Sequence, residues 1–270
     1  MKTFRLVSAA LLAVLMCANF ASCSKDDDAN IDTGGEDVVV GEKKLVKMDG
    51  TLSYDSDTYT YNYTFSYDNE GRLSSAIETY SYDNGNGKSE SKYSYKLIWG
   101  DDAVVVKYEK ESGDYTNTYT YTLKDGLVQN YITDSNNGTY YYNSSNSLIK
   151  AEFTGKGYTI NAVWNKDKLV SVRHSYANYG SGTPSILTYG ESCKKGYFPL
   201  ISDIIGCEDV LFMAHPEIAG MRTNQLPNTY SYADDEEFSL TYEYDKEGYI
   251  SKIKMKNEDG ESETYTLTWK

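Results

Sequence analysis

One stretch of the sequence decides the fold: Thr58-Tyr59-Thr60-Tyr61-Asn62-Tyr63-Thr64-Phe65-Ser66-Tyr67. Aromatic and small polar residues alternate strictly along it. Successive side chains of a β-strand point to opposite faces, so a period of two places one kind of residue on each face. We therefore predict a strand with one aromatic face, buried or partly buried, and one hydroxylated face in water.

The same alternation recurs far along the chain. It covers residues 118–123, 238–244 and 265–269, and the chain holds 28 tyrosines in all. The turn Tyr67-Asp-Asn-Glu-Gly-Arg-Leu73 recurs as Tyr244-Asp-Lys-Glu-Gly-Tyr-Ile250. Asp favours the start of a type I turn, and Gly supplies the positive φ that rejoins the next strand. Looser copies of this turn between the two predict a chain of β-hairpins.

A different pattern interrupts the hairpins near the C-terminal third. All four prolines fall between Pro184 and Pro227, and apolar residues between them recur at helical spacing. Pro199 is well placed to begin a helix. We predict a short helical insertion near residues 199–221 that plugs or caps the sheet, with its apolar side in the core.

Together these patterns predict an all-β fold. We expect an antiparallel hairpin meander that is curled into a soluble barrel-like or partly open porin-like sheet, as a single domain over residues 42–270. A membrane barrel needs an aliphatic outer band with aromatic residues only at its edges. Here the face opposite the tyrosines carries Thr, Ser, Asn, Lys and Glu, which indicates a wall in water.

The N-terminus carries the features of an export signal. Lys2 and Arg5 precede an apolar run that is too short to span a bilayer, which favours a signal peptide over residues 1–22. The run ends in Phe20-Ala21-Ser22-Cys23, which resembles the lipobox of bacterial lipoproteins and implies a lipid on Cys23. The alternative is an ordinary signal peptide that leaves Cys23 as a free thiol.

Residues 23–41 predict an acidic, flexible tether. Its start, Ser24-Lys25-Asp26-Asp27-Asp28, resembles the surface-export tag of Bacteroidota lipoproteins. The resemblance implies a place on the outer membrane, facing the cell exterior. A solvated linker with no such role is the alternative.

The net charge of the chain limits the kinds of molecule that it can bind. Loss of Lys2 and Arg5 with the signal peptide takes the net charge from −14 to −16. A chain of this charge is repelled by phosphate backbones, so we expect no nucleic-acid binding.

Two cysteines remain after Cys17 is removed and Cys23 is lipidated. Cys193 and Cys207 could form a disulfide, which exported proteins commonly carry, or remain as two buried free thiols. Both alternatives stay open.

A resemblance to a known family rests on several of these features together. The lipobox, the Tyr-Asp-x-x-Gly hairpins and the segment Gly220-Met-Arg-Thr-Asn-Gln-Leu-Pro227 resemble a Bacteroidota lipoprotein family, domain of unknown function 4595, described as having a porin-like fold. A weaker similarity links Tyr67–Leu73 to the YD repeats of bacterial shell-forming proteins. The first resemblance implies a fold and a location but no activity.

No motif indicates catalysis, and we expect no catalytic residue, no metal and no cofactor. His174 and His215 lie in no nucleophile or metal motif, and the spacing of Cys193, Cys207 and His215 fits no zinc pattern. The acidic runs Asp101-Asp102 and Asp234–Glu237 lack the spacing of a calcium loop and read as solvated turns.

We therefore predict a non-enzymatic binding module for a glycan, a peptide or a small amphiphile, because tyrosine offers both a ring face and a hydroxyl. Simple core packing is the competing role for most tyrosines. Two further hypotheses are a structural or assembly partner of an outer-membrane complex and an unrecognised hydrolase with two facing carboxylates. The candidate ligand-facing aromatics are Tyr59, Tyr61, Tyr63, Tyr119, Tyr121, Tyr242 and Tyr244.

Overall fold

A computed structural model describes residues 42–270, except 55–56, 114, 208 and 233–235. The predicted signal peptide, Cys23 and the tether lie outside the described residues. The strands are β1 (Leu45–Tyr54), β2 (Asp57–Tyr67), β3 (Leu73–Asp83), β4 (Lys88–Trp99), β5 (Ala103–Lys110), β6 (Thr116–Lys124), β7 (Leu127–Ile132), β8 (Asn137–Tyr142), β9 (Leu148–Phe153), β10 (Tyr158–Asn165), β11 (Lys168–Tyr176), β12 (Gly180–Ser181), β13 (Ser185–Ser192), β14 (Gln225–Tyr232), β15 (Glu236–Tyr244), β16 (Ile250–Lys256) and β17 (Ser262–Trp269). The helical segments are η1 (Thr154–Lys156), α1 (Ile201–Ile205), α2 (Val210–Ala214) and η2 (Pro216–Ala219).

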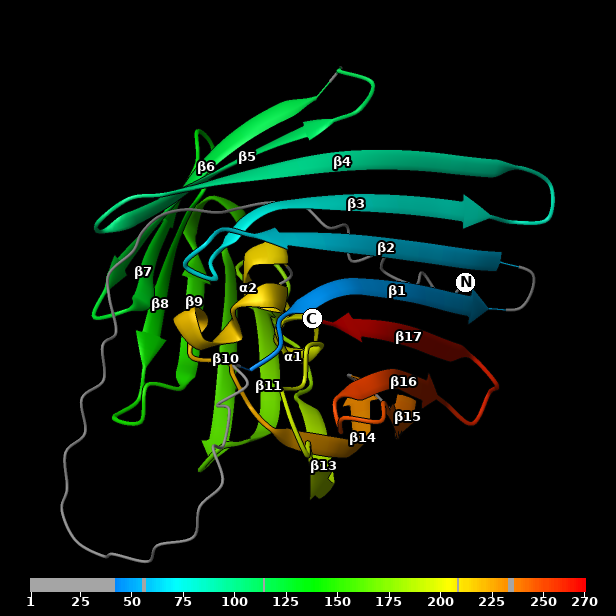
Figure 1. Ribbon diagram of the computed structural model, residues 1–270. Coiled ribbons are helices and arrows are strands. Elements are labelled where there is room, and N and C mark those ends of the chain that lie inside the picture. The colour runs from blue at the N-terminus through cyan, green and yellow to red at the C-terminus, as the bar shows by residue number, and fades with distance from the viewer. Residues whose placement is uncertain (1–41, 55–56, 114, 208, 233–235) are drawn as a thin grey trace, which may run out of the picture.

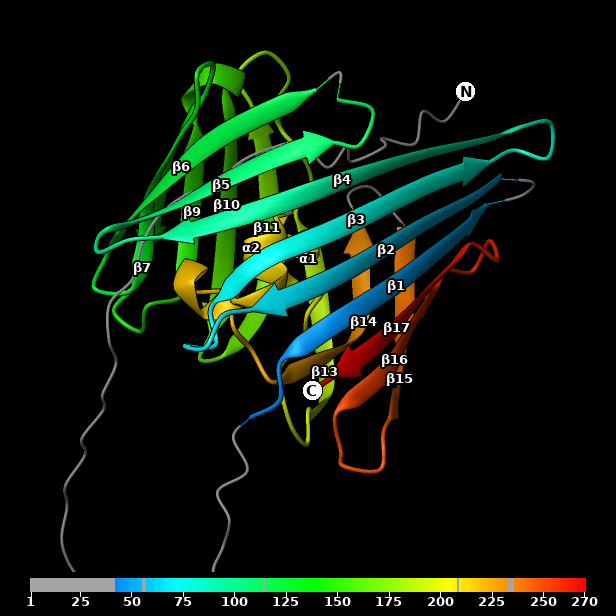
Figure 2. The ribbon, with the colours of Figure 1, turned by 45° about the horizontal axis from the view of Figure 1, so that its top comes forward.

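The strands form one antiparallel ladder that closes on itself. Each strand from β1 to β11 pairs with the next, β11 continues to β13, and β17 returns to pair with β1. Sixteen strands make the ring, because β12 pairs only with β11 among the described residues. The wall can be followed around the molecule in Figures 1 and 2. The predicted antiparallel barrel is confirmed in its closed form, and at one end β4 extends past β5, so that residues 88–91 pair with β3 alone among the described residues.

The register of the ladder puts the aromatic side chains on the inner face. On β2 and β3, Tyr61 lies opposite Tyr80 and Tyr63 lies opposite Glu78. Phe65, on the same face of β2, is 3% exposed and belongs to the core. The alternate residues, such as Thr58, Thr60 and Thr64, therefore line the outer wall.

The outer wall carries polar side chains such as Thr58, Thr60 and Thr64, together with exposed aliphatic side chains such as Ile77, Val163 and Ile186. No helix among the described residues is long and apolar enough to cross a bilayer.

The helical insertion fills one end of the barrel. It follows β13 and precedes β14, and Figure 1 shows α1 and α2 inside the ring of strands. Every residue of α2 is buried, and the ring of Phe212 packs 4.9 Å from that of Tyr121 and 6.2 Å from that of Tyr140. The insertion predicted near residues 199–221 is confirmed, and its apolar side lies in the core. We call this end the plugged end, and the opposite end of the barrel the mouth.

The recurring hairpin turns close in the same way at the plugged end. The carboxylate of Asp245 accepts hydrogen bonds from the backbone N–H groups of Glu247 at 2.9 Å and Tyr249 at 3.0 Å. Asp68 makes the same two contacts in its own turn, and Gly71 and Gly248 adopt positive φ. The sequence repeat therefore reflects one turn geometry used twice.

Replacement of Asp245 by alanine is expected to lower the free energy of unfolding by about 1 kcal/mol, because two backbone donors lose their acceptor. Asp245→Asn keeps an acceptor oxygen and should stay close to the wild type. Urea unfolding measures both. An unchanged midpoint for Asp245→Ala would show that water replaces the carboxylate without loss.

Candidate functional site

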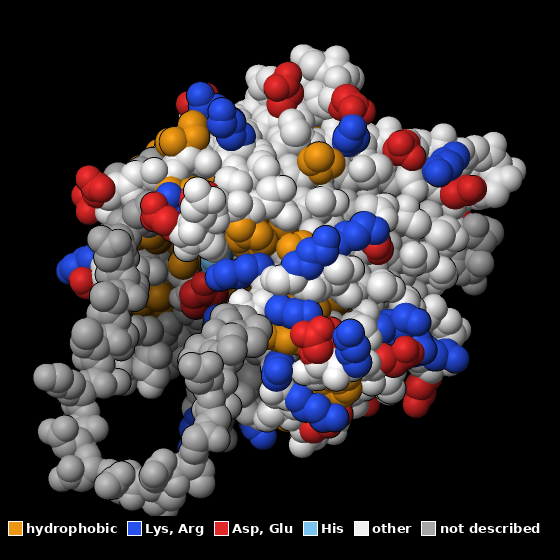
Figure 3. Space-filling view, in the orientation of Figure 1, with side chains coloured by type: hydrophobic (Ala, Val, Ile, Leu, Met, Phe, Trp, Pro, Cys, Tyr) orange, Lys and Arg blue, Asp and Glu red, His pale blue; other side chains and the backbone are white. Residues whose placement is uncertain are grey.

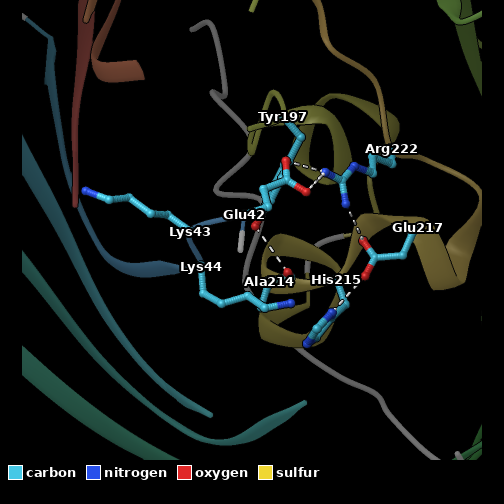
Figure 4. Close-up of a pocket in the computed structure, with 8 residues that line it drawn as sticks. All are labelled: Glu42, Lys43, Lys44, Tyr197, Ala214, His215, Glu217 and Arg222. Atoms are coloured by element: carbon cyan, nitrogen blue, oxygen red, sulfur yellow. Dashed lines mark hydrogen bonds and ion pairs between the residues drawn. The ribbon is translucent and has the colours of Figure 1, made fainter. Parts of the chain in front are cut away.

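A polar pocket lies at the plugged end, where the chain enters the barrel (Figure 4). Arg222 donates hydrogen bonds of 2.6 Å to both carboxylate oxygens of Glu42, and its other terminal nitrogen lies 4.0 Å from Glu217. Glu217 in turn accepts a 2.8 Å hydrogen bond from Nδ1 of His215. The backbone N–H of Leu73 donates to Nε2 of that ring at 3.2 Å.

This chain of contacts fixes the state of His215. Because Nε2 accepts from a backbone N–H, it carries no proton, and Nδ1 is the donor to Glu217. His215 is 7% exposed and packs edge-on against the rings of Tyr67 and Trp99. Both ring nitrogens therefore have hydrogen-bond partners. The contacts of this pocket connect Glu42, the helical insertion and β3.

The predicted ligand-facing tyrosines divide between packed and accessible positions. Tyr63, Tyr119 and Tyr121 are 6%, 2% and 1% exposed, so the structure corrects their assignment: the insertion and the neighbouring rings pack over them. The remaining four are half-buried. Two of these, Tyr242 and Tyr244, lie near the plugged end of β15, where the hydroxyl of Tyr242 donates to the backbone carbonyl of Pro227 at 2.6 Å.

Cys193 and Cys207 are both buried free thiols, so the structure shows the second of the two states that the sequence left open. The two thiols act on different tyrosines: after the larger effect of burial, Cys193 contributes to raising the pKa of Tyr242 and Tyr244, and Cys207 to raising that of Tyr140 and Tyr142. Burial raises the pKa of Cys193 to about 12, which keeps it in the unreactive thiol form.

A thiol reagent should therefore leave Cys193 and Cys207 unmodified in the folded protein and label both after unfolding without reductant. Intact mass before and after denaturation reads this directly. A mass that shows no added label until a reductant is present would reveal a disulfide instead.

Rings that face inward remain accessible at the mouth. The rings of Tyr59 and Tyr82 stack at 4.7 Å, and those of Tyr61 and Tyr80 lie 5.2 Å apart. All four are half-buried. Figure 1 shows the β2–β3–β4 hairpin ends reaching beyond the neighbouring strands. We call Tyr59, Tyr61, Tyr80 and Tyr82 the aromatic shelf; it is one part of the tyrosine face that stays half-buried.

Two residues of β17 adjoin the shelf: Glu263 lies opposite Leu52, which lies opposite Tyr59, and Tyr265 lies opposite Gly50, which lies opposite Tyr61. Four of the five residues of α1 are buried, and Asp203 is the exposed one. Its charge contributes to raising the pKa of Glu263 and of Tyr265 on β17, after the larger effect of desolvation. The hydroxyl of Tyr265 donates a 2.8 Å hydrogen bond to Glu263. We call Asp203, Glu263 and Tyr265 the floor, and the shelf and the floor together the mouth cluster.

The surroundings of Asp203 and Glu263 raise the pKa of both carboxyl groups. Desolvation by the enclosing wall raises the pKa of Asp203 to about 6. Desolvation, with the nearby charge of Asp203, raises that of Glu263 to about 7. Among the described residues, neither carboxylate forms an ion pair with Lys or Arg.

A further inward carboxylate lies within the wall. Glu78 is 3% exposed and accepts hydrogen bonds from the hydroxyls of Tyr95 at 2.5 Å and Tyr63 at 3.3 Å. Burial raises its pKa, and these two hydrogen bonds oppose the shift. Glu78 is therefore a satisfied buried group that supports the tyrosines around it.

A glycine makes room for the ring of Tyr265. Gly50 lies opposite Tyr265 across β1 and β17, and a Cβ at Gly50 would stand 2.9 Å from the ring carbon Cε1. The ring can therefore lie over the β1 backbone while its hydroxyl reaches Glu263.

Gly50→Ala is expected to displace that ring and lower the free energy of unfolding by about 1 kcal/mol through overpacking. Gly87 provides a matched control, because a Cβ there meets nothing within 4 Å. Gly87→Ala should be neutral. Thermal unfolding compares the two variants, and equal melting temperatures would show that the ring shifts at no cost.

The remaining candidates do not assemble into a reactive site. His174 shares a hydrogen bond with the hydroxyl of Tyr158 and touches the backbone of Gly206 just after α1. Asp101 and Asp102 are exposed at the plugged end, and Asp234 and Asp235 lie outside the described residues. No group of three His, Cys, Asp or Glu within the described ranges could hold a metal ion.

Comparison with known proteins bears on the fold. No family model matches the chain, and no curated protein matches it. The chain is similar to a crystal structure of a porin-like protein from Bacteroides uniformis, at 17% identity and a TM-score of 0.64, over 84% of this chain and 98% of that one. This similarity establishes a porin-like fold.

Two further structures align with lower scores. A porin-like protein from Bacteroides vulgatus is 11% identical, with a TM-score of 0.30 over 85% of this chain and 99% of that one. A putative outer membrane lipoprotein-sorting protein domain from Vibrio parahaemolyticus is 10% identical, with a TM-score of 0.24 over 85% and 86%. Neither score is high enough to support an inference.

Proposed function

We propose that this chain is a non-enzymatic binding protein, anchored by a lipid on Cys23 at the outer face of the outer membrane, that receives a ligand in its mouth. The proposal rests on a difference in solvent exposure between the tyrosines of the two halves of the inner face. Tyr121 and its neighbours are sealed by the insertion, whereas the shelf tyrosines face inward and stay half-exposed. Rings that are held in a recess by a rigid barrel suit the binding of a glycan, a peptide or a small amphiphile.

The path of the chain supports an outward-facing site. Glu42, the first described residue, is held by Arg222 at the plugged end. Any tether that precedes it therefore reaches the barrel at the end opposite the mouth. A protein held by such a tether presents its mouth away from the membrane. The neighbour in Bacteroides uniformis, which is named a porin-like protein, is consistent with an envelope location.

Binding can be tested on a glycan array and on a panel of peptides and amphiphiles, with Tyr80→Ala as the test variant. Tyr141 offers a matched control, because it is a tyrosine of the outer wall that is 41% exposed. Binding that Tyr80→Ala abolishes and Tyr141→Ala preserves supports the proposal. Binding that survives Tyr80→Ala, or the absence of any ligand across all panels, contradicts it.

The location has its own test. Protease treatment of intact cells should remove the domain, and lysis should not be required. Palmitate labelling that is lost in Cys23→Ser checks the anchor. A domain that resists until the cells are lysed would overturn the outward display.

A second candidate function follows from the floor. The charge of Asp203 acts on Glu263, and a pair of carboxyl groups is what glycoside hydrolysis requires. At neutral pH the group with a pKa of about 6 is mostly ionised, whereas the group near 7 keeps part of its protons, so one could act as base and the other as acid. Chromogenic glycosides test this. Turnover that disappears in both Asp203→Asn and Glu263→Gln would favour the hydrolase.

A further inference from the structure

An open sheet edge lies at the mouth, at the start of β4. Among the described residues, β4 pairs with β3 from Lys88 onward, whereas its pairing with β5 begins only at Tyr93. The carbonyl of Lys92 still accepts a 2.8 Å hydrogen bond from the backbone N–H of Glu111, just past the end of β5. Residues 88–91 therefore have a neighbouring strand on one side only. Figure 1 shows the β3–β4 hairpin reaching beyond β5.

The hydrogen bond at Lys92 fixes which backbone groups of this edge point outward. In an antiparallel ladder the N–H and C=O of one residue point to the same side of the strand, and that side alternates along the chain. The carbonyl of Lys92 points toward β5, so the groups of Lys88 and Glu90 point the same way. No described strand lies beside them there. An edge of this kind is a template for a further strand.

The side chains along this edge alternate in charge. Lys88 and Glu90 share the outer face, where they are 59% and 60% exposed and their charged atoms lie 3.8 Å apart. Ser89, between them, points to the inner face beside Tyr82. Opposite charges stabilise a pair of residues that face each other across two strands, and like charges destabilise it. A strand that matches this edge therefore places an anion opposite Lys88 and a cation opposite Glu90.

A second copy of the same edge meets this requirement. Two copies that are related by a twofold axis pair antiparallel, and outward-pointing residues must face each other to exchange hydrogen bonds. With the axis at Ser89, Lys88 of each copy lies opposite Glu90 of the other. An axis at Lys88 or at Glu90 would set that residue against itself, with like charges opposed. Charge therefore selects a single register.

We propose that this chain forms a homodimer through its β4 edges, paired antiparallel about Ser89. Each of the two Lys88–Glu90 pairs exchanges two backbone hydrogen bonds, and the four charged side chains alternate in sign on the outer face. On the inner face, the row Tyr59–Tyr82–Ser89 continues into the second copy in reverse order. The two shelves then form one aromatic surface. This pairing needs no ligand, so it is independent of the binding function proposed above.

The register can be tested by cysteine cross-linking of the full chain in detergent. Ser89→Cys brings two copies of residue 89 together as a non-hydrogen-bonded pair, with Cα atoms about 4.5 Å apart, which a disulfide can bridge. Ser91→Cys is the matched control, because in this register its two copies are about 13 Å apart. After mild oxidation, we expect at least about tenfold more disulfide-linked dimer from Ser89→Cys on a non-reducing gel. Equal yields, or no dimer from Ser89→Cys, would overturn the inference.

Charge reversal tests the same pairing without a new thiol. Lys88→Glu sets like charges opposite each other in both pairs, and so does Glu90→Lys. Each variant alone should weaken dimerisation by about fivefold or more, as read by sedimentation velocity. The two variants mixed in equal amounts restore opposite charges and should recover the dimer. A mixture that is no more dimeric than its components would refute this register.

A proline at the edge separates this contact from association elsewhere on the surface. Glu90→Pro removes an N–H that points away from β3, a position where edge strands tolerate proline, and we expect it to abolish the dimer. Glu90→Gln keeps the N–H and should weaken dimerisation by less than about threefold. Circular dichroism checks that both variants keep the fold. A dimer that persists in folded Glu90→Pro would show that the copies meet through another surface and would contradict the proposal.

Discussion

Phe212→Ala is expected to lower the free energy of unfolding by about 4 kcal/mol, the largest effect of any single change considered for this chain. Phe212 is 1% exposed and packs against Tyr121 and Tyr140 inside the barrel. Its removal leaves a cavity between a five-residue helix and the wall. The strands around Phe212 are held in a closed ladder, so the wall cannot easily collapse into that cavity. Urea unfolding, followed by tyrosine fluorescence and circular dichroism, measures the loss.

The control for this prediction lies on the outer wall. Val163 is 55% exposed, and Val163→Ala should change the free energy of unfolding by less than about 0.5 kcal/mol. The same experiment reports on the mouth, because α1 and α2 belong to one insertion and Asp203 forms the floor. If Phe212→Ala cost less than about 1 kcal/mol, the insertion would be a loosely held segment and not part of the core.

The alternation of residues was sufficient to predict the strands, and the reason is geometric. A period of two along 58–67 fixes which side chains share a face, whatever the partner strand. The turn repeat fixed the antiparallel order, since each Asp-x-x-Gly turn joins neighbours. Closure of the ring was not determined by any single segment. It depends on β17 meeting β1, a contact between the two ends of the domain that no local pattern encodes.

The alternating pattern also does not predict whether a given tyrosine is buried or exposed. Tyr61 and Tyr121 have the same local sequence, Thr-Tyr, and both point inward. One is half-exposed at the mouth and the other is sealed under Phe212. What separates them is where the insertion ends inside the barrel, and that depends on its packing against many strands at once.

The floor was missed for two different reasons. Glu263 shares its face with Tyr265, Leu267 and Trp269, so the period of two already placed a carboxylate on the inner face of β17. Asp203 had no such signal, because the direction of a side chain on a five-residue helix follows from how the helix is packed.

The raised pKa values at the floor carry a consequence for stability, and its sign can be worked out. Both groups bind a proton more tightly in the folded chain than in the unfolded one, where the values are 3.8 for Asp203 and 4.5 for Glu263. Their favourable contribution is therefore fully present below about pH 4. It is lost as the pH rises through about 6 and 7, because the folded chain must then hold two poorly solvated charges.

Replacement of Asp203 by asparagine together with Glu263 by glutamine should remove that loss. Between pH 5 and pH 8, the free energy of unfolding of the wild type is expected to fall by about 2 kcal/mol relative to that of this variant. This is less than the full pKa shift of Glu263 implies, because solvent reaches the side chain. Urea midpoints at both pH values, converted with a common slope, give the difference directly. Other carboxyl groups titrate alike in the two proteins and cancel in the comparison. Parallel pH profiles would mean that the two carboxylates are well solvated, and the recess would then be too open to desolvate a bound ligand.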